Sequence, residues 1–487
     1  MTDTTPIELG SRLELLVDDF LIDRVAGAEL RLQHPTPRET VMVFDRPWEG
    51  SGCGYVTVFE DEGRYRMYYK AWHLGVDESG VDGGGVSTSD LHICYAESDD
   101  GSAWVRPELG LFEHAGSGAN NIVWDGNGGH GFAPFRDDNP DAPAEARYKA
   151  FGHGTLDGAR VVFAFGSPDG IRWSMLRDEP VLTDCAFDSQ NLAFWDGARG
   201  EYRAYVRDFR GGRLGAGLRD IKTATSPDFI RWTEPRWLRY PGAPGEALYT
   251  NQVAPYPRAP HLFVGLPARY VERGWSPSMR ALPDPENRSM RARSQERYGT
   301  AVTDSLLMTS RDGLSFNRWG EAFVRPGIQR PGTWAYGDHY LQSGLVRTAS
   351  ALPGAPDELS LYSVEDYWLG SACSLRRYSL RVDGFVSLHA PLSGGEMVTK
   401  PLTFAGDRLV LNFATSAAGA IRVEMQDADG HPLEGFALSD CDEVFGDEIE
   451  RTVTWRGGES DVSSFAGQPI RLRFAMSDAD LFSLRFI

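Results

Sequence analysis

The sequence predicts an all-β fold, in which a five-bladed β-propeller over residues 1–390 is followed by a β-sandwich over residues 391–487. Short alternating strands separated by turn residues run along the whole chain, which is typical of all-β architectures. A segment built around an aspartate recurs five times, and the recurrence stops where the second range begins. Hydrophobic residues make up 41% of the chain and aromatic residues 11%, which suits large β-sheet cores.

The recurring segment is a tight turn closed by an aromatic residue. Its aspartates are Asp100, Asp169, Asp228, Asp312 and, in a degenerate copy, Asp383. The steps between them are 69, 59, 84 and 71 residues, and repeats of this length that hold several short strands indicate radial blades. An aspartate in such a turn accepts hydrogen bonds from the backbone that follows it. We therefore interpret the five aspartates as structural and exclude them as catalytic candidates.

Each repeat contains four candidate strands. In the first they are GYVTVFED, YRMYYKAWH, HICYAES and a strand from Trp104 onward, and in the second GFAPFRD, YKAFGHG, RVVFAFGS and RWSML. The third repeat begins at Asp188, the fourth at Leu248, and the fifth runs from Tyr340 to the strand FVSL. Because closure of a ring removes exposed sheet edges, we expect the early strand from Leu13 to Ile22 to complete it.

The last part of the chain has another pattern. After Pro391 the segments RLVLNFATS, AIRVEMQDADG, ERTVTWRGG and IRLRFAMSD alternate in hydrophobicity without the aspartate turn. Strands of this kind over residues 391–487 predict a β-sandwich that serves as an accessory domain.

Bulk properties exclude several classes of function. The net charge of −20 argues against nucleic acids and anionic membrane surfaces as partners. No apolar run approaches the roughly 20 residues that span a bilayer, and the first residues lack the pattern of a signal peptide. The cysteines are odd in number and lack metal-site spacing, which favours reduced thiols and a cytoplasmic location. They are Cys53, Cys94, Cys185, Cys373 and Cys441.

Four carboxylates stand where the inner strand of a repeat begins. They are Glu49, Asp188, Glu246 and Asp338. Because inner strands converge on the propeller axis, we expect these side chains to meet in a central funnel. Carboxylates held close together push their pKa values apart. Cleavage of a glycosidic bond needs such a pair, one to protonate the leaving oxygen and one to act as base or nucleophile.

Other polar residues allow two interpretations each. Asp18 and Asp19, in VDDFLID, either end an early strand or enter the funnel, and with Asp338 they are the replacements if Glu49 points away. His130 stands at an inner-strand entry, which favours substrate contact, although a lone histidine is more often structural. The arginine-rich insertion over residues 266–300 either clamps an anionic group or pairs with nearby acids.

The chain resembles glycoside hydrolase family 32, the invertases, levanases and inulinases, and their five-bladed arabinanase-like relatives. WEGSGCGYVTVFEDEGRYRMYYKAW is similar to the invertase opening, in which Trp-Met-Asn-Asp-Pro-Asn-Gly runs into strands. FDSQNLAFWD is similar to the Arg-Asp-Pro motif around Asp188, with Phe187 and Ser189 as replacements. Glu246 falls where the Glu-Cys motif places its acid. With VDDFLI, GYVTVF and FGDEIER, the whole chain also resembles a bacterial group of invertase-like proteins.

This resemblance implies a set of roles. Glu49 attacks the anomeric carbon, Glu246 protonates the leaving oxygen, and Asp188 stabilises the transition state. The residues implied to contact the substrate are His130, Asn191, Asn251, Tyr336, Asp338 and Asp19. The implied activity is hydrolysis of a small oligosaccharide at a furanosidic bond, such as a fructofuranoside or arabinofuranoside, without a cofactor. A structural cation in the central channel and a homo-oligomer are both compatible with the sequence.

Three alternatives stay open. A non-catalytic sugar-binding propeller predicts aromatic rings in the funnel and no close carboxylate pair. A glycoside phosphorylase needs one acid and a basic phosphate pocket. The third alternative is a scaffold that binds proteins on its rim. It does not explain why acidic residues recur where the inner strands begin. The sequence contains neither a serine-hydrolase elbow nor a metal motif that favours a further enzyme class.

Overall fold

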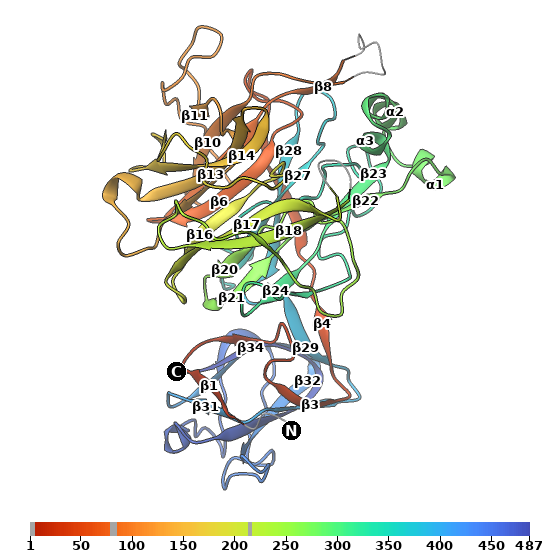
Figure 1. Ribbon diagram of the computed structural model, residues 1–487. Coiled ribbons are helices and arrows are strands. Elements are labelled where there is room, and N and C mark those ends of the chain that lie inside the picture. Colours follow the sequence, from red (N-terminus) through yellow and green to blue (C-terminus); the bar gives the residue numbers. More distant parts are fainter. Residues whose placement is uncertain (1–4, 78–84, 213–216) are drawn as a thin grey trace.

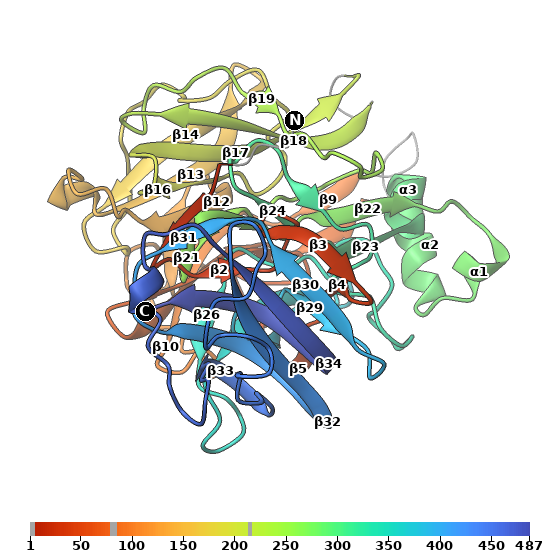
Figure 2. The same cartoon turned by 90° about the horizontal axis from the view of Figure 1, so that it is seen from below.

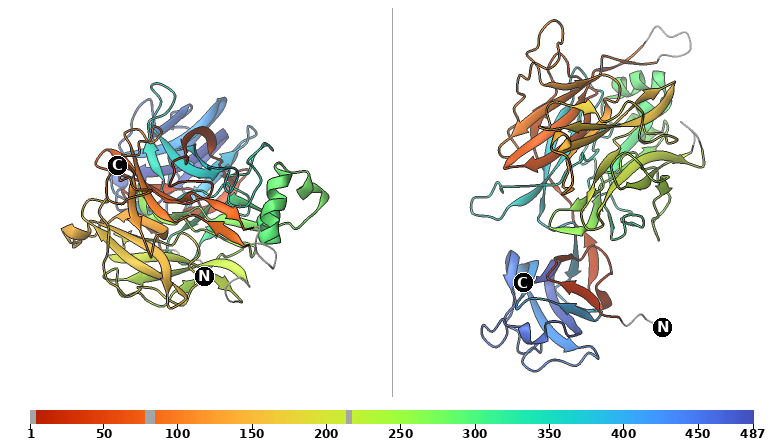
Figure 3. Two further views of the ribbon diagram at one scale, coloured as in Figure 1. Left: turned by 90° about the horizontal axis from the view of Figure 1, so that it is seen from above. Right: turned by 60° about the vertical axis from the view of Figure 1, so that its left-hand side comes forward.

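The computed structural model describes residues 5–77, 85–212 and 217–487. It consists of a propeller and a smaller β-domain stacked end to end (Figure 1). Both termini lie in the smaller domain, and in the view from below that domain covers the near end of the propeller (Figure 2). The view from above shows the blades arranged around an axis (Figure 3).

Five four-stranded sheets form the blades, so the predicted five-bladed propeller is confirmed. From the inner to the outer strand they are β6 (Gly54–Asp61), β7 (Arg64–Ala71), β10 (His92–Ser98) and β11 (Ile122–Asp125) in blade one; β12 (His130–Arg136), β13 (Tyr148–Leu156), β14 (Ala159–Ser167) and β15 (Ser174–Met175) in blade two; β16 (Leu192–Asp196), β17 (Glu201–Arg210), β18 (Leu218–Ser226) and β19 (Arg236–Trp237) in blade three; β20 (Ala254–Tyr256), β21 (Ala259–Gly265), β24 (Met308–Ser310) and β25 (Asn317–Arg318) in blade four; and β26 (Val346–Thr348), β27 (Glu358–Glu365), β28 (Ser374–Arg381) and β5 (Thr36–Val43) in blade five.

Two outer strands differ from the prediction. The ring is closed by β5, which pairs with β28, and neither Leu13–Ile22 nor FVSL takes that place. In blade one the outer strand is β11, whereas Val105 makes only an isolated bridge to Glu97. The chain therefore closes the propeller with a strand that precedes all the other blade strands in sequence.

The second domain is built from both ends of the chain. Its strands are β1 (Ile7–Gly10), β2 (Glu14–Leu15), β3 (Ile22–Ala26), β4 (Glu29–Leu32), β29 (Val386–Ala390), β30 (Gly395–Thr399), β31 (Leu402–Phe404), β32 (Leu409–Asp427), β33 (Asp447–Thr452) and β34 (Ile470–Phe486). They form one hydrogen-bonded sheet, in which the long β32 and β34 fold over a core that contains Trp455 and Phe474. The β-sandwich is thus confirmed, with its layers joined through these two strands.

The predicted boundary after residue 390 needs correction. Strands β1 to β4 precede the propeller in sequence, yet each pairs with a C-terminal strand of the sandwich. The reason is the antiparallel pairing of β4 with β29, in which Leu32 lies opposite Val386, so that the chain enters and leaves the propeller side by side (Figure 1). The N-terminal segment 7–32 and β29 therefore belong to the sandwich.

The aspartate turns hold the hairpin ends together, as predicted. In the first, Asp100 Oδ1 accepts hydrogen bonds from the backbone of Ser102 at 2.7 Å and Ala103 at 2.8 Å. The turns at Asp169, Asp228 and Asp312 repeat this geometry. These carboxylates are committed to the backbone and are not available for chemistry.

The Arg-rich insertion forms a side wall of the propeller. It consists of the hairpin β22 (Ala268–Glu272) and β23 (Ala301–Ser305) and the helices α1 (Pro277–Arg280), α2 (Pro285–Ser294) and α3 (Glu296–Thr300). Helix α2 lies against the hairpin of β8 (Leu74–Val76) and β9 (Val86–Thr88), at the end of the propeller that faces away from the sandwich (Figure 1).

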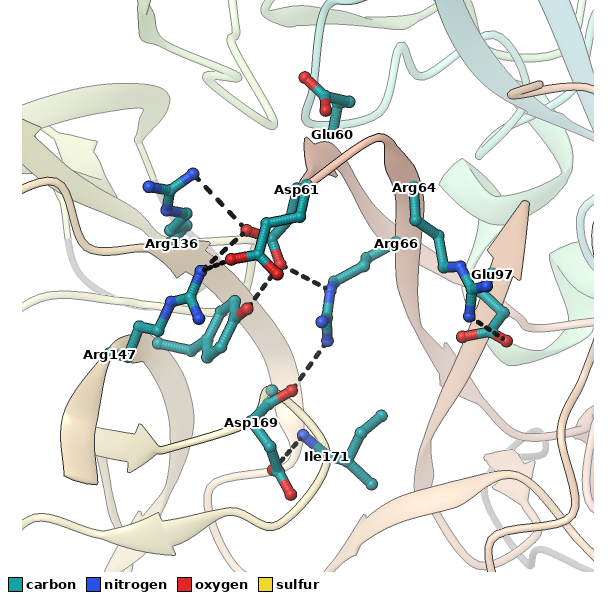
Figure 4. Close-up of polar contacts among 12 residues, drawn as sticks. Glu60, Asp61, Arg64, Arg66, Glu97, Arg136, Arg147, Asp169 and Ile171 are labelled. Atoms are coloured by element: carbon teal, nitrogen blue, oxygen red, sulfur yellow. Dashed lines mark hydrogen bonds and ion pairs between the residues drawn. The ribbon is translucent and has the colours of Figure 1, made fainter. Parts of the chain in front are cut away.

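A buried carboxylate ties blade one to blade two. Asp61, at the end of β6, accepts a hydrogen bond from Tyr148 Oη at 2.5 Å and lies 3.1 Å from Arg66 and 3.6 Å from both Arg136 and Arg147 (Figure 4). Arg66 also donates to the backbone oxygen of Asp169, which joins the network to the aspartate turn of blade two (Figure 4).

We expect Asp61→Ala to lower the free energy of unfolding by about 2 kcal/mol, because it leaves the buried Tyr148 hydroxyl and the partly buried Arg66 without their acceptor. Urea unfolding measures the loss. The matched control is Asp99→Ala, since Asp99 is exposed and its ion pair with Arg64 spans 3.7 Å. Equal, small losses in both variants would contradict a stabilising role for the network.

Candidate active site

Hydrogen-bonded glutamines fill the propeller axis. Gln252 donates to Gln190 Oε1 at 2.9 Å, and Gln190 in turn donates to the backbone oxygen of Tyr55 at 3.0 Å and to Thr57 Oγ1 at 2.9 Å. Gln342 accepts from the backbone N–H of Val56 at 2.7 Å. These amides form a floor that links the inner-strand segments of blades one, three, four and five.

A narrow cavity of about 30 Å³ lies beside this floor. Its wall is largely aromatic, with rings that come from four different segments near the axis. They are Tyr55, Tyr249, Tyr336, Tyr340 and Tyr367. Tyr336 and Tyr249 are linked through their hydroxyls at 3.3 Å. Aromatic walls with a few polar groups are typical of small-molecule sites, but about 30 Å³ is the volume of roughly one water molecule, so this cavity alone does not hold a sugar.

Asp188 is the centre of a polar cluster beside this cavity, and Lys70 belongs both to the cluster and to the cavity lining. One carboxylate oxygen lies 3.1 Å from Arg160 of β14 and 3.7 Å from Arg207 of β17, and the other lies 4.0 Å from His130 at the start of β12. Burial opposes ionisation, but Arg207 and Arg160 outweigh it and lower the pKa of Asp188. Its side chain is 34% exposed, so this ionised carboxylate remains accessible.

We refer to the aromatic cavity and the polar cluster around Asp188 together as the axial cleft. The backbone directly before Asp188 has an unusual conformation. Phe187 has a φ of 45° with its ring fully buried, and Tyr55 of the cavity wall has a φ of 49°. Non-glycine residues adopt this conformation only when the surroundings hold them there, and such strain concentrates at functional sites. The turn at Phe187 presents the next side chain to the axis.

Two histidines lie against Asp188. His130 and His153 face each other with their Nδ1 atoms 3.0 Å apart. Burial lowers the pKa of both, to about 4 for His153. Both rings are therefore neutral near pH 7, and one Nδ1–H donates to the other. His130 also lies edge-on to Trp72 and Tyr55.

Lys70 completes the cluster from β7. It is 4% exposed, and its Nζ lies 4.0 Å from the ring centre of Trp72 and 4.5 Å from that of Tyr55. Among the residues that the structure describes, no acceptor hydrogen-bonds its ammonium and no carboxylate pairs with it. Burial lowers the pKa of Lys70 to about 8, against the opposing influence of Asp188.

Glu49 is not at the cavity, which corrects its predicted role as nucleophile. Its carboxylate is fully buried and forms two bonds to Arg106, at 2.9 and 3.0 Å, and a third to Tyr69 Oη at 2.5 Å. A nucleophile has to be free to approach the substrate. This carboxylate instead holds the outer part of blade one to the segment before β6.

Glu246 is also paired, against its predicted role as proton donor. It forms ion pairs with Arg269, at 2.8 Å, and with Arg318. Burial raises its pKa, but the hydrogen bonds from Arg318 and Arg269 outweigh this and lower it below the ordinary value. A proton donor needs the opposite shift. The sequence interpretation missed that Arg269, from the insertion, reaches this carboxylate.

The two asparagines predicted to contact substrate hold the backbone instead. Asn191 donates to the backbone oxygens of Phe187, at 2.8 Å, and Ser189. Asn251 donates to the backbone oxygens of Gln190, at 3.2 Å, and Tyr205, at 3.3 Å. Their amide nitrogens are thus engaged in shaping the inner strands, which corrects the prediction.

Asp19 lies outside the cleft as well. It is exposed beside the sandwich, where its backbone oxygen accepts a hydrogen bond from Lys400. Its neighbour Asp18 pairs with Arg311 at 2.9 Å. Neither aspartate replaces Glu49, because the segment 7–32 that carries them folds into the sandwich.

Of the predicted contacts Tyr336 and Asp338, only Tyr336 belongs to the cavity wall. Tyr336 lines the cavity directly, whereas Asp338 is fully buried behind it and accepts the backbone N–H of Tyr367 at 2.9 Å. Burial raises the pKa of Asp338 well above its ordinary value, although Arg291 opposes the shift. Burial therefore favours the protonated form of this carboxyl.

The insertion supports the wall through its arginines. Arg291 of α2 is buried and donates to the backbone oxygens of Tyr336, Tyr367 and Trp368. Arg269 pairs with Glu246 and Asp304. Of the two predicted alternatives, pairing with nearby acids describes Arg269, whereas Arg291 bonds to backbone oxygens.

Several residues of the cluster were missed from the sequence. Lys70 directly follows the apolar and aromatic run MYY, and Arg207 directly follows AYV, each in a largely buried part of its strand. Charged residues are almost never fully buried unless they are paired, so each is a signal for a site near the axis. Arg160 and His153 carry no comparable signal, because their strands are polar at those ends.

Two kinds of feature are absent from the described residues. Over the described ranges, no helix has the length and apolar character needed to cross a membrane. In the same part of the chain, no three or more His, Cys, Asp or Glu side chains are grouped so that they could hold a metal ion.

Comparison with known proteins gives only distant structural likeness. No protein-family model matches the chain, and no curated protein sequence does. Solved structures align to it at low identity. An N-acetylgalactosamine deacetylase from F. plautii is 14% identical, with 73% of this chain and 96% of that one covered and a TM-score of 0.41.

Two further structures give similar values. A glycosyl hydrolase from Bacteroides ovatus is 14% identical over 73% of this chain and 96% of that one, with a TM-score of 0.37. The GH32 β-fructofuranosidase of Bombyx mori is 10% identical over 92% and 94%, with a TM-score of 0.39. These values are too low to carry an activity from any of these proteins to this chain.

Proposed function

We propose that this protein cleaves a glycosidic bond of a small saccharide bound at the axial cleft of the propeller, with Asp188 as the reacting carboxylate. One observation carries the proposal. Asp188 is ionised, accessible and set among buried polar side chains beside an aromatic cavity. Strongly perturbed titratable groups that gather in a cavity are typical of catalytic sites.

The chemistry follows from the charge. The transition state of glycosidic cleavage is oxocarbenium-like, so a carboxylate beside the anomeric carbon stabilises it directly or attacks it. The rings of Tyr55, Tyr249 and Tyr336 supply apolar surface for the sugar. A fructofuranoside or arabinofuranoside is the substrate that the sequence resemblance favours, and the proposal adopts it as the first class to test.

The leaving oxygen also needs a proton. Burial favours the protonated form of Asp338, which lies between the cavity residues Gly337 and Tyr340 in sequence. Its Oδ2 atom has no partner in the part of the chain that the structure describes. We assign it the role of proton source, with Asp188 as its ionised counterpart. Two carboxyls whose environments push their pKa values apart are the arrangement that acid–base division requires.

Asp338→Asn tests this role through the leaving group. We expect cleavage of alkyl glycosides and disaccharides to fall by about 10²-fold or more, because general acid catalysis is lost. Nitrophenyl glycosides should keep most of their rate, since nitrophenolate leaves without a proton. The asparagine can still accept the N–H of Tyr367. An equal loss for both leaving groups would assign Asp338 to structure.

A second function has specific support. Glu49 and Glu246 are both held by arginines, so the aromatic cleft lacks a directly facing pair of carboxylates among the described residues. This is the arrangement predicted above for a sugar-binding propeller without turnover. Such a protein would use the same rings and the same Asp188, as an acceptor for sugar hydroxyls.

The deciding experiment is a substrate panel. The wild-type protein is incubated with nitrophenyl furanosides and pyranosides and with fructo-oligosaccharides, with and without phosphate, and binding is measured in parallel by calorimetry. Cleavage without phosphate supports the proposal, whereas cleavage only with phosphate shows a phosphorylase. Binding without any cleavage would transfer the assignment to the sugar-binding propeller.

A further inference from the structure

The positive charge around Asp188 is larger than one carboxylate can neutralise. Lys70, Arg160 and Arg207 carry three positive charges against a single negative one, and His130 and His153 are neutral. This excess is notable because the chain as a whole has a net charge of −20. The cleft is therefore a local reversal of charge.

We propose that the saccharide taken by this cleft carries its own anionic oxygen group, a carboxylate or a phosphate ester, which Lys70 binds together with Arg207. The inference deepens the proposed function, because it names the substrate class of the same cleft. It rests on the contacts of two buried cations and not on the cleavage step.

Lys70 is the first of these cations. It lines the cavity and is 4% exposed, and among the described residues it has only the rings of Trp72 and Tyr55 as close partners of its charge. A buried ammonium without a hydrogen-bond acceptor is strongly disfavoured. An anionic oxygen at the cavity would supply the missing acceptor.

Another buried lysine shows how this chain otherwise treats the problem. Lys149 is also 4% exposed, but it pairs with Asp137 and donates to the backbone oxygen of Ala146. The protein thus supplies the partners of this buried lysine itself, and no ligand is needed to pair with it. Lys70 differs in having none and in facing a cavity.

Arg207 is the second cation. Its side chain is 3% exposed, and its distance of 3.7 Å from Asp188 is an ion pair without hydrogen-bond contact. Its Nε atom has no partner among the described residues, and the rings of Phe209 and Tyr249 flank its guanidinium at 5.1 and 5.0 Å. Asp188 is already bonded more closely by Arg160, so Arg207 retains donors for a ligand.

The test measures binding and does not need turnover. Calorimetry is run with hexuronic acids, hexose and pentose phosphates, the corresponding neutral sugars and inorganic phosphate. The proteins are wild type, Lys70→Met and, as the matched control, Arg172→Met, which removes an exposed cation far from the cleft. We expect at least one acidic sugar to bind about 10-fold or more tightly than its neutral parent, because hydrogen bonds to charged groups are the strong ones.

Lys70→Met should remove that preference, and Arg172→Met should keep it. The melting temperature of unliganded Lys70→Met should rise, since the variant replaces an unpaired buried charge by an apolar chain of similar length. This readout separates lost recognition from lost folding. A uronic acid that binds best identifies a carboxylate, and a sugar phosphate that binds best identifies a phosphate ester.

Three results would overturn the inference. The first is equal affinity for acidic and neutral sugars, and the second is no detectable binding of any acidic sugar. The third is inorganic phosphate that binds as tightly as the sugar phosphates, because the bound anion would then not belong to the saccharide. The inference and the proposed function fail separately. A preference for acidic sugars without cleavage leaves the inference standing, and cleavage of neutral glycosides without that preference leaves only the function.

Discussion

Replacement of Asp188 by asparagine is expected to lower kcat/KM by roughly 10³-fold or more, because it removes the one ionised carboxylate that the cleft presents to the anomeric carbon. Asparagine has nearly the same shape and keeps an acceptor for Arg160, so the fold should persist. The loss is therefore expected in kcat more than in the affinity for a neutral part of the substrate.

The measurement compares initial rates on the best substrate of the panel. Glu246→Gln is run beside Asp188→Asn, because the sequence assigned the acid to Glu246 and the structure pairs that residue with Arg269 and Arg318. We expect Glu246→Gln to lose thermal stability and to keep most of its turnover. The reverse pattern, with Glu246→Gln inactive and Asp188→Asn active, would refute the assignment of Asp188.

The largest effect on stability is expected at Asp383. Its carboxylate is fully buried between the two domains and accepts hydrogen bonds from Tyr256 at 2.6 Å, Arg258 at 3.1 Å, Asn412 at 3.2 Å and Ser483 at 3.1 Å. The first two come from blade four and the last two from the sandwich. Asp383 is thus the polar link at the centre of the interface.

We expect Asp383→Ala to lower the free energy of unfolding by about 4 kcal/mol, because the donors from Tyr256, Asn412 and Ser483 and the partly buried Arg258 lose this acceptor. The positive φ of Asp383, 63°, adds strain to the alanine variant. Asp383→Asn keeps one accepting oxygen and tolerates this φ, so we expect it to lose about half as much stability as Asp383→Ala. Urea unfolding measures both variants.

A matched surface variant and a second readout complete this test. Asp357→Ala removes an exposed acid of blade five, whose partner Arg347 is also exposed, and should change stability little. Limited proteolysis should cut Asp383→Ala between β28 and β29 sooner than the wild type, since the sandwich is released from the propeller. Equal protease resistance of both proteins would contradict the proposed link.

The repeated pattern of the sequence predicted most of the fold. Strand alternation and the aspartate turns are local features, with hydrogen bonds between residues two or three positions apart, as at Asp100 and Ala103. Such features can be recognised without the partner strands. The closure of the ring could not be predicted in this way. β5 and β28 are separated by more than 300 residues, and no local pattern indicates that they pair.

The domain boundary shows the same limit. Alternating strands predict a sheet but not which sheet they join, so β1 to β4 gave no sign that they pair with β29, β30, β31 and β34. Asp383 illustrates the consequence. It was grouped with the aspartate turns by its sequence, whereas its partners lie in blade four and the sandwich.

The sequence by itself determined the fold class and the position of Asp188 at an inner-strand mouth, because both follow from local periodicity. Only the tertiary structure decided which carboxylates are available for chemistry. Glu49 and Glu246 occupy equivalent mouths, but Arg106 and Arg318, remote in sequence, neutralise them. A carboxylate's protonation state and reach depend on burial and on the charges around it, and folding alone brings those charges together.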